Sequence, residues 1–174
     1  MARQAHATRE ALPPQPVPAG GSAFLSPEWI HQVVAAIEEA KAKDPYLRGL
    51  VGDLTFKVAY VIEDAPSCVR SLYGNGSKVV VCVSLRNGAV EDFKAGSRTP
   101  SHPVDLIVTV PYGIAEKLFR GEIGAASTLL GGEVRVKPVN GFAAWTKMAA
   151  KSLVSASQVL KTARTVPTRF SLES

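Results

Sequence analysis

The chain has 174 residues, 46% of them hydrophobic, and a net charge of +5, which fits one ordinary domain with a tail. Its longest apolar run, Val79 to Val83, is far shorter than the roughly 18 residues of a membrane span, and the proline-bearing start lacks the apolar core of a secretory signal. Cys68 and Cys82 lie fourteen residues apart without nearby histidines, so the sequence indicates neither a zinc spacing nor a disulfide framework, and a soluble, cytoplasmic protein is expected.

Residues 1–23 contain four prolines between positions 13 and 18 and then glycines, so they predict a disordered tail. A domain is expected over residues 24–166, followed by a flexible C-terminus at 167–174. Ser26 and Pro27 are a typical N-cap and first helical residue. Apolar residues at helical spacing extend the predicted helix to about Lys43, where Asp44 and the following proline stop it.

Alternating apolar residues predict a strand over 54–62, and a second strand is expected over 68–73. Asn75-Gly76 matches the turn of a tight hairpin, because both central residues of a type I′ turn need positive φ. The third strand is then expected over 78–86. Asn87-Gly88 indicates another turn or bulge, and residues 104–110 a fourth strand.

A short helix is predicted from Pro111 to Phe119 and a second over 125–130, separated and ended by glycines. A strand over 133–137 follows, and then a long helix runs from about residue 141 to Arg164 before Pro167 stops it. Strands and helices segregated in this order predict an α+β domain with helices packed on one face of the sheet.

Three segments carry a likeness to a known family: Val104 to Val108, Leu118 to Ile123, and Leu129 to Val136. In this order, and with the opening Phe24 to Trp29, they resemble the sterol carrier protein type 2 family over about residues 24–164. The resemblance implies a five-stranded, mainly antiparallel sheet with helices on one face enclosing an apolar tunnel. Members hold sterols, fatty acids or fatty acyl-coenzyme A, and neither catalytic residues nor a cofactor come with the fold. The proline-bearing link Lys137 to Gly141 departs from the family pattern, so a different tunnel mouth is expected.

A lipid tail needs apolar walls and few polar anchors, and a sixteen-carbon chain gains on the order of 10 kcal/mol on leaving water. The predicted tunnel lies between one sheet face, two short glycine-flanked helices and the start of the long helix. Its predicted lining consists of Leu106, Val108, Ile114, Leu118, Phe119, Leu129, Leu130, Phe142, Trp145, Met148 and Ala149. For any single one of them, a place in an ordinary core is the competing interpretation.

The long helix carries Lys147, Lys151 and Lys161 opposite its apolar side. A basic face can attract an anionic membrane at up to about 1 kcal/mol per charge. The competing interpretation is a solvated helix face.

No other chemistry is indicated. His6, His31 and His102 have no partners at metal-ligand spacing, and no G-x-S-x-G motif is present. The basic residues lack the interleaved exposed aromatics of a nucleic-acid site. Cys82 is expected to be a small buried hydrophobe.

We therefore expect a non-enzymatic protein that binds a hydrophobic lipid and transfers or presents it. A fatty acid or fatty acyl thioester is the first choice of ligand, and a sterol-like molecule the second. The alternative is an interaction module that holds enzymes of lipid metabolism at an anionic membrane through the basic C-terminal helix. The oligomeric state is left open.

Overall fold

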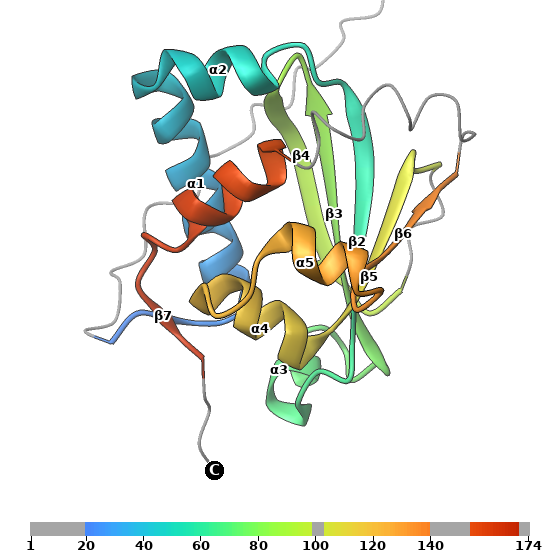
Figure 1. The fold of residues 1–174 in the computed structure, drawn as a ribbon. Coiled ribbons are helices and arrows are strands. Elements are labelled where there is room, and N and C mark those ends of the chain that lie inside the picture. Colours follow the sequence, from blue (N-terminus) through green and yellow to red (C-terminus); the bar gives the residue numbers. More distant parts are fainter. Residues whose placement is uncertain (1–19, 99–102, 140–153, 171–174) are drawn as a thin grey trace, which may run out of the picture.

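The computed structural model describes residues 20–98, 103–139 and 154–170. Helices pack on one face of a five-stranded sheet, which confirms the expected α+β class (Figure 1). The sheet strands are β2 (Phe56–Glu63), β3 (Lys78–Arg86), β4 (Ala89–Gly96), β5 (Leu106–Pro111) and β6 (Arg135–Pro138). The helices are α1 (Pro27–Lys43), α2 (Pro45–Val51), α3 (Ser67–Ser71), α4 (Tyr112–Arg120) and α5 (Ala125–Leu130), and residues 154–163 are also helical.

The strand order is β4-β3-β2-β5-β6, and three of the four strand pairs are antiparallel. The central pair of β2 and β5 is parallel, so the sheet is mixed, although most of its pairs are antiparallel as expected. β5 runs in the same direction as β2 and β4, because the chain crosses from one edge of the sheet to the far side of β2 before β5 begins. The connection from Gly96 to Leu106 is therefore a crossover and not a hairpin.

The segment expected as a second strand is a short helix, α3. Val69 in α3 and Tyr73 in the turn directly after it are 1% and 9% exposed, and they lie four positions apart, which is the spacing of one helical face. The apolar residues of this segment follow the period of a helix and not the two-residue period of the predicted strand. Without a strand before it, Asn75-Gly76 is not a hairpin turn, and the residues at this point connect α3 to β3.

The sheet hairpin lies at the second Asn-Gly pair, between β3 and β4. Asn87 has a φ of 50° and Gly88 a φ of 73°, as a type I′ turn requires. β4 was missed because it is an edge strand, whose charged residues alternate poorly with apolar ones.

The prediction for α1 is confirmed, and a second helix, α2, was missed directly after it. Ser26 Oγ accepts a hydrogen bond from the Trp29 amide at 3.2 Å at the start of α1. Asp44 both ends α1 and caps α2, since its carboxylate accepts from the Tyr46 and Leu47 amides at 2.8 and 3.3 Å. An Asp-Pro pair is a helix start as much as a helix stop.

A second, two-stranded sheet joins the two ends of the described chain. β1 (Ser22–Ala23) and β7 (Thr168–Arg169) pair in parallel, and the Phe24 amide donates to the Arg169 carbonyl at 2.9 Å. Both strands belong to segments that the sequence assigned to the tails. Figure 1 shows this pair beside the lower end of α1, away from the large sheet.

The main core lies between the sheet and the helices and contains residues of α1, α4, β2, β3 and β5. Phe24, 1% exposed, is the centre of an aromatic cluster. Its ring centroid lies 4.9 to 5.6 Å from those of Trp29, Tyr112, Phe119 and Phe170. The cluster ties both ends of the chain to α1 and α4.

Candidate functional site

The helix-covered face of the sheet is unevenly buried. At one end Ile62 pairs with Val79 and Val110, and these three residues are 4%, 0% and 7% exposed. They belong to the same core cluster as Trp29 of α1 and Ala115 of α4. This end of the sheet is packed as an ordinary core.

Two residues further along the same face, burial is incomplete. Tyr60 pairs with Val108, Val108 pairs with Val136 of β6, and Leu106 lies on the same face two residues before Val108. Tyr60 is 40% exposed, and the other three residues are half-buried. We call Tyr60, Leu106, Val108 and Val136 the half-buried patch. It brings together two residues predicted from the sequence and two that were missed.

Tyr60 is unusual for its position in the central strand. Although 40% of it is exposed, burial raises the pKa of its phenol above the ordinary value of 10.0. The side chain is therefore partly enclosed by protein atoms and borders accessible space. Among the residues that the structure describes, its hydroxyl has no hydrogen-bond partner.

The predicted site residues on α4 lie in three different settings. Leu118 is buried at 8% exposure, and Ile114 is half-buried against the core. Phe119 packs in the aromatic cluster, with its ring centroid 5.0 Å from that of Trp29. Most of the apolar side of α4 is therefore packed in the core or against it.

On α5, two neighbouring leucines differ. Leu129 is half-buried, whereas Leu130 is 89% exposed and lies in solvent. Thr128, 1% exposed, fixes the helix, because its hydroxyl donates to the carbonyls of Gly124 and Ala125. Of the α5 pair, only Leu129 has the partial burial expected of a wall residue.

Four predicted residues of the long helix lie outside the described part of the chain: Phe142, Trp145, Met148 and Ala149. The described residues 154–163, at the end of the predicted helix, are helical, and Ala163 is 1% exposed in the main core. The predicted roles of the four residues remain predictions.

An open pocket of about 490 Å³ lies where the end of α4 meets the segment after residue 163. Among the described residues, Phe119 is the one predicted lipid residue in its lining. The remaining lining residues are Arg120, Glu122, Ala163, Arg164, Thr165, Val166, Pro167, Thr168 and Phe170. Because polar groups, including the side chains of Arg120, Glu122 and Arg164, make up much of this wall, it differs from the apolar tunnel that the sequence predicts.

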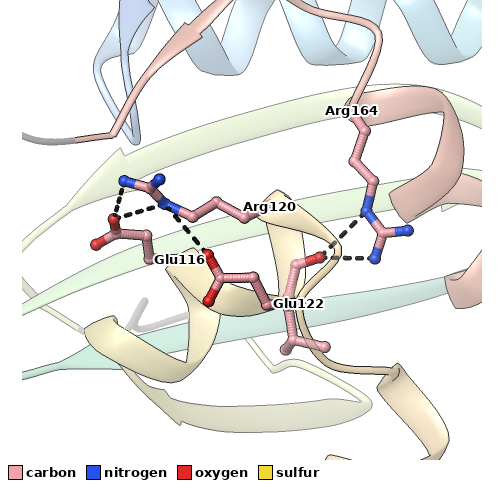
Figure 2. A network of polar contacts seen from close by, with 5 residues as sticks. Glu116, Arg120, Glu122 and Arg164 are labelled. Carbon is pink, nitrogen blue, oxygen red and sulfur yellow. Dashed lines mark hydrogen bonds and ion pairs between the residues drawn. The ribbon is translucent and has the colours of Figure 1, made fainter.

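The charged groups of this pocket hold neighbouring elements together (Figure 2). The Arg164 guanidinium donates to the Leu118 carbonyl from Nε at 3.2 Å and from Nη2 at 2.7 Å. Arg120 pairs with Glu116 at 2.7 Å, and its guanidinium carbon lies 4.6 Å from the centroid of the Phe170 ring. Gly121, at φ 81°, ends α4 and leaves room for the Arg164 guanidinium. We interpret this network as structural: it holds the end of α4 against the segment after residue 163.

Two features are absent from residues 20–98, 103–139 and 154–170. No three His, Cys, Asp or Glu side chains there come together as a metal site. In the same residues, no helix is long and apolar enough to cross a membrane. Cys82 is partly buried beside Ala59 and Val80, and burial raises the pKa of its thiol, as expected of a small hydrophobe.

No family model matches this chain, and no curated protein matches its sequence. Several solved structures match most of it, among them two with TM-scores above 0.6. A crystal structure of sterol carrier protein 2 has a TM-score of 0.63 at 17% identity, over 82% of this chain and 98% of the other. The solution structure of a conserved hypothetical protein from Thermus thermophilus, described as possibly a sterol carrier protein, has a TM-score of 0.64 at 19% identity. That match covers 88% of this chain and 99% of the other.

This chain has the sterol carrier protein 2 fold. The resemblance found in the sequence is confirmed at the level of the fold, over nearly the whole length of both solved structures. The internal tunnel of the sterol carrier fold remains a prediction for this chain. Tyr60 and Val136 could have been found from the sequence only with the strand register, which places them beside Val108.

Proposed function

We propose that this protein binds a hydrophobic lipid without catalysis and transfers or presents it. The half-buried patch carries the proposal, because three of its four residues are apolar and incompletely covered on a face that helices otherwise bury. The sterol carrier fold supports it, since the matching solved structures are described as a sterol carrier protein or possibly one. A fatty acid or a fatty acyl thioester is the first candidate ligand.

The chemistry of the patch suits a hydrocarbon. Burying each methylene stabilises a complex by about 0.8 kcal/mol, so a sixteen-carbon chain supports micromolar or tighter binding after the costs of association. The same chain gains a similar amount in a bilayer. Exchange with membranes is therefore close to balanced, which favours transfer or presentation over permanent storage.

Native mass spectrometry of the freshly purified full chain tests the proposal. We expect a mass increase that matches a fatty acid or another single-chain lipid, and a loss of this mass after delipidation. Delipidated protein should regain the mass when mixed with vesicles that contain palmitic acid. A protein that carries no lipid when purified and takes none from vesicles would contradict the proposal.

Substitutions at Val108 test the place of binding. Val108→Trp fills space beside the half-buried patch, and we expect it to lower lipid uptake at least tenfold while the melting temperature stays high enough for a folded protein. Val154→Trp is the matched control, because Val154 is 43% exposed on the helical segment 154–163. Unchanged uptake by a folded Val108→Trp variant would move the site away from the patch.

The membrane-scaffold alternative stays a prediction. Of the three lysines of the predicted basic helix face, Lys161 is described and exposed. Lys147 and Lys151 lie outside the described residues. Salt-sensitive binding of the lipid-free protein to anionic vesicles would favour this alternative.

A further inference from the structure

The sheet wall of the proposed lipid site contains one polar atom that an all-apolar wall would not need. Tyr60 lies in the middle of β2 and pairs directly with Val81 and Val108, whose side chains offer no hydrogen bonds. A phenylalanine would give the same ring without the hydroxyl. A phenol hydroxyl away from water is costly unless it has a partner.

Two of the three other tyrosines, Tyr73 and Tyr46, have an evident partner for the phenol hydroxyl. Tyr73 is 9% exposed, and its hydroxyl donates to the Leu25 carbonyl at 2.6 Å. Tyr46 is 64% exposed and lies in water. Tyr60 fits neither case, because it lies on the helix-covered face with 40% of its surface accessible and no described partner.

We propose that the Tyr60 hydroxyl hydrogen-bonds an oxygen of the lipid held against the half-buried patch, so that the preferred ligand is a single-chain lipid bearing a carboxylate, carbonyl or hydroxyl. The inference deepens the proposed function and rests on it. Contacts of the lipid tail with Leu106, Val108 and Val136 contribute affinity, but they do not depend on where the tail lies along the patch. The single phenol selects for an oxygen and fixes where it lies along the sheet.

The protonation state of the phenol agrees with this role. Burial raises the pKa of Tyr60, so the group is neutral near pH 7. A neutral phenol donates to a carboxylate or carbonyl and also accepts from an alcohol. It serves all three oxygen types without placing a charge beside the hydrocarbon.

Binding of matched twelve-carbon ligands tests the inference. Dodecanoic acid, 1-dodecanol and dodecane are mixed separately with the delipidated full chain, and bound ligand is measured by native mass spectrometry. We expect Tyr60→Phe to weaken binding of the acid and the alcohol about five- to tenfold, the size of one hydrogen bond, and to leave dodecane unchanged. Tyr46→Phe is the control and should bind all three ligands like the original protein.

Carbon-13 labelling of the tyrosine ζ-carbons gives a second readout that a purely structural role would not move. The Tyr60 resonance is the one missing from Tyr60→Phe, and it should shift with dodecanoic acid or 1-dodecanol but much less with dodecane. The Tyr73 resonance should stay in place, because its hydroxyl is already bonded.

The two proposals fail in different ways. If the original protein binds all three ligands and Tyr60→Phe binds them equally well, the phenol holds only water, and this inference is overturned while lipid binding stands. If the original protein binds none of the ligands and carries no lipid when purified, the proposed function and the inference are both overturned.

Discussion

Tyrosines in the interior of this protein differ in what holds their hydroxyl groups. Tyr73 is bonded to a backbone carbonyl, whereas Tyr60 has no described partner and borders accessible space. A polar group in an apolar interior is tolerated only where a partner or water reaches it. The difference between these two residues separates a structural phenol from a candidate ligand contact.

Tyr112 makes stability sensitive to high pH. Burial, with a smaller contribution from Glu116, raises the pKa of its phenol from 10.0 to about 12. Above pH 10 the unfolded state releases this proton while the folded state keeps it, so the free energy of unfolding falls as pH rises from about 10 to about 12. Each such tyrosine contributes up to roughly 1.4 kcal/mol per pH unit in that window.

We therefore expect Tyr112→Phe to lose its stability more slowly than the original protein between pH 10 and 12. Urea unfolding at several pH values measures this. Equal pH dependence of the two proteins would show that Tyr112 is as accessible to hydroxide in the folded state as in the unfolded one.

At the scale of elements, the C-terminal half of α1 is joined to the β3–β4 hairpin by a small polar cluster. The Lys41 ammonium, whose side chain is 11% exposed, pairs with Glu38 at 2.6 Å and donates to the Gly88 carbonyl. Glu38 also accepts from the Val90 amide at 3.1 Å. Helix and hairpin thus share two hydrogen bonds, and the Lys41–Glu38 pair within α1 links the two side chains that make them.

Lys41→Ala should lower the free energy of unfolding by about 1–3 kcal/mol, because it leaves the Gly88 carbonyl without this donor and Glu38 without its counter-charge. Urea unfolding gives the value. Lys43→Ala is the matched control, since the Lys43–Glu39 pair is exposed on the same helix and its loss should change little. Similar stabilities for the two variants would mean that the cluster does not hold the hairpin.

At the scale of the whole molecule, the two ends of the described chain pair with each other and pack against the helices. Next to the paired strands β1 and β7, the Phe24 amide donates a hydrogen bond to the Arg169 carbonyl. The Trp29 indole donates a hydrogen bond to the Thr168 hydroxyl at 2.8 Å. Phe170 completes the aromatic cluster around Phe24. Contacts so far apart in sequence make the ends part of the folded unit.

A chain that ends at Val166 should therefore melt at least about 5 °C lower than the full chain, because it lacks β7 and Phe170. Thermal unfolding followed by circular dichroism measures this. Hydrogen exchange at the Phe24 amide should also become faster, since its acceptor is gone. An unchanged melting temperature would show that residues 167–174 add nothing to the fold.

The sequence alone determined the fold class, the helix α1, the helices α4 and α5, and the resemblance to sterol carrier proteins. These follow from local signals: caps, helical spacing and glycine stops act within a few residues of each other. For the same reason, a segment with mixed signals, such as residues 68–73, was assigned the wrong period.

Only the tertiary structure decided which strands are neighbours and which apolar residues are covered. The parallel pairing of β2 with β5 places Tyr60 beside Val108, and nothing near Tyr60 in the sequence indicates that contact. The difference between buried Leu118 and exposed Leu130 likewise depends on what packs against each helix. Local patterns select the elements, whereas burial is a property of surfaces that long-range contacts bring together.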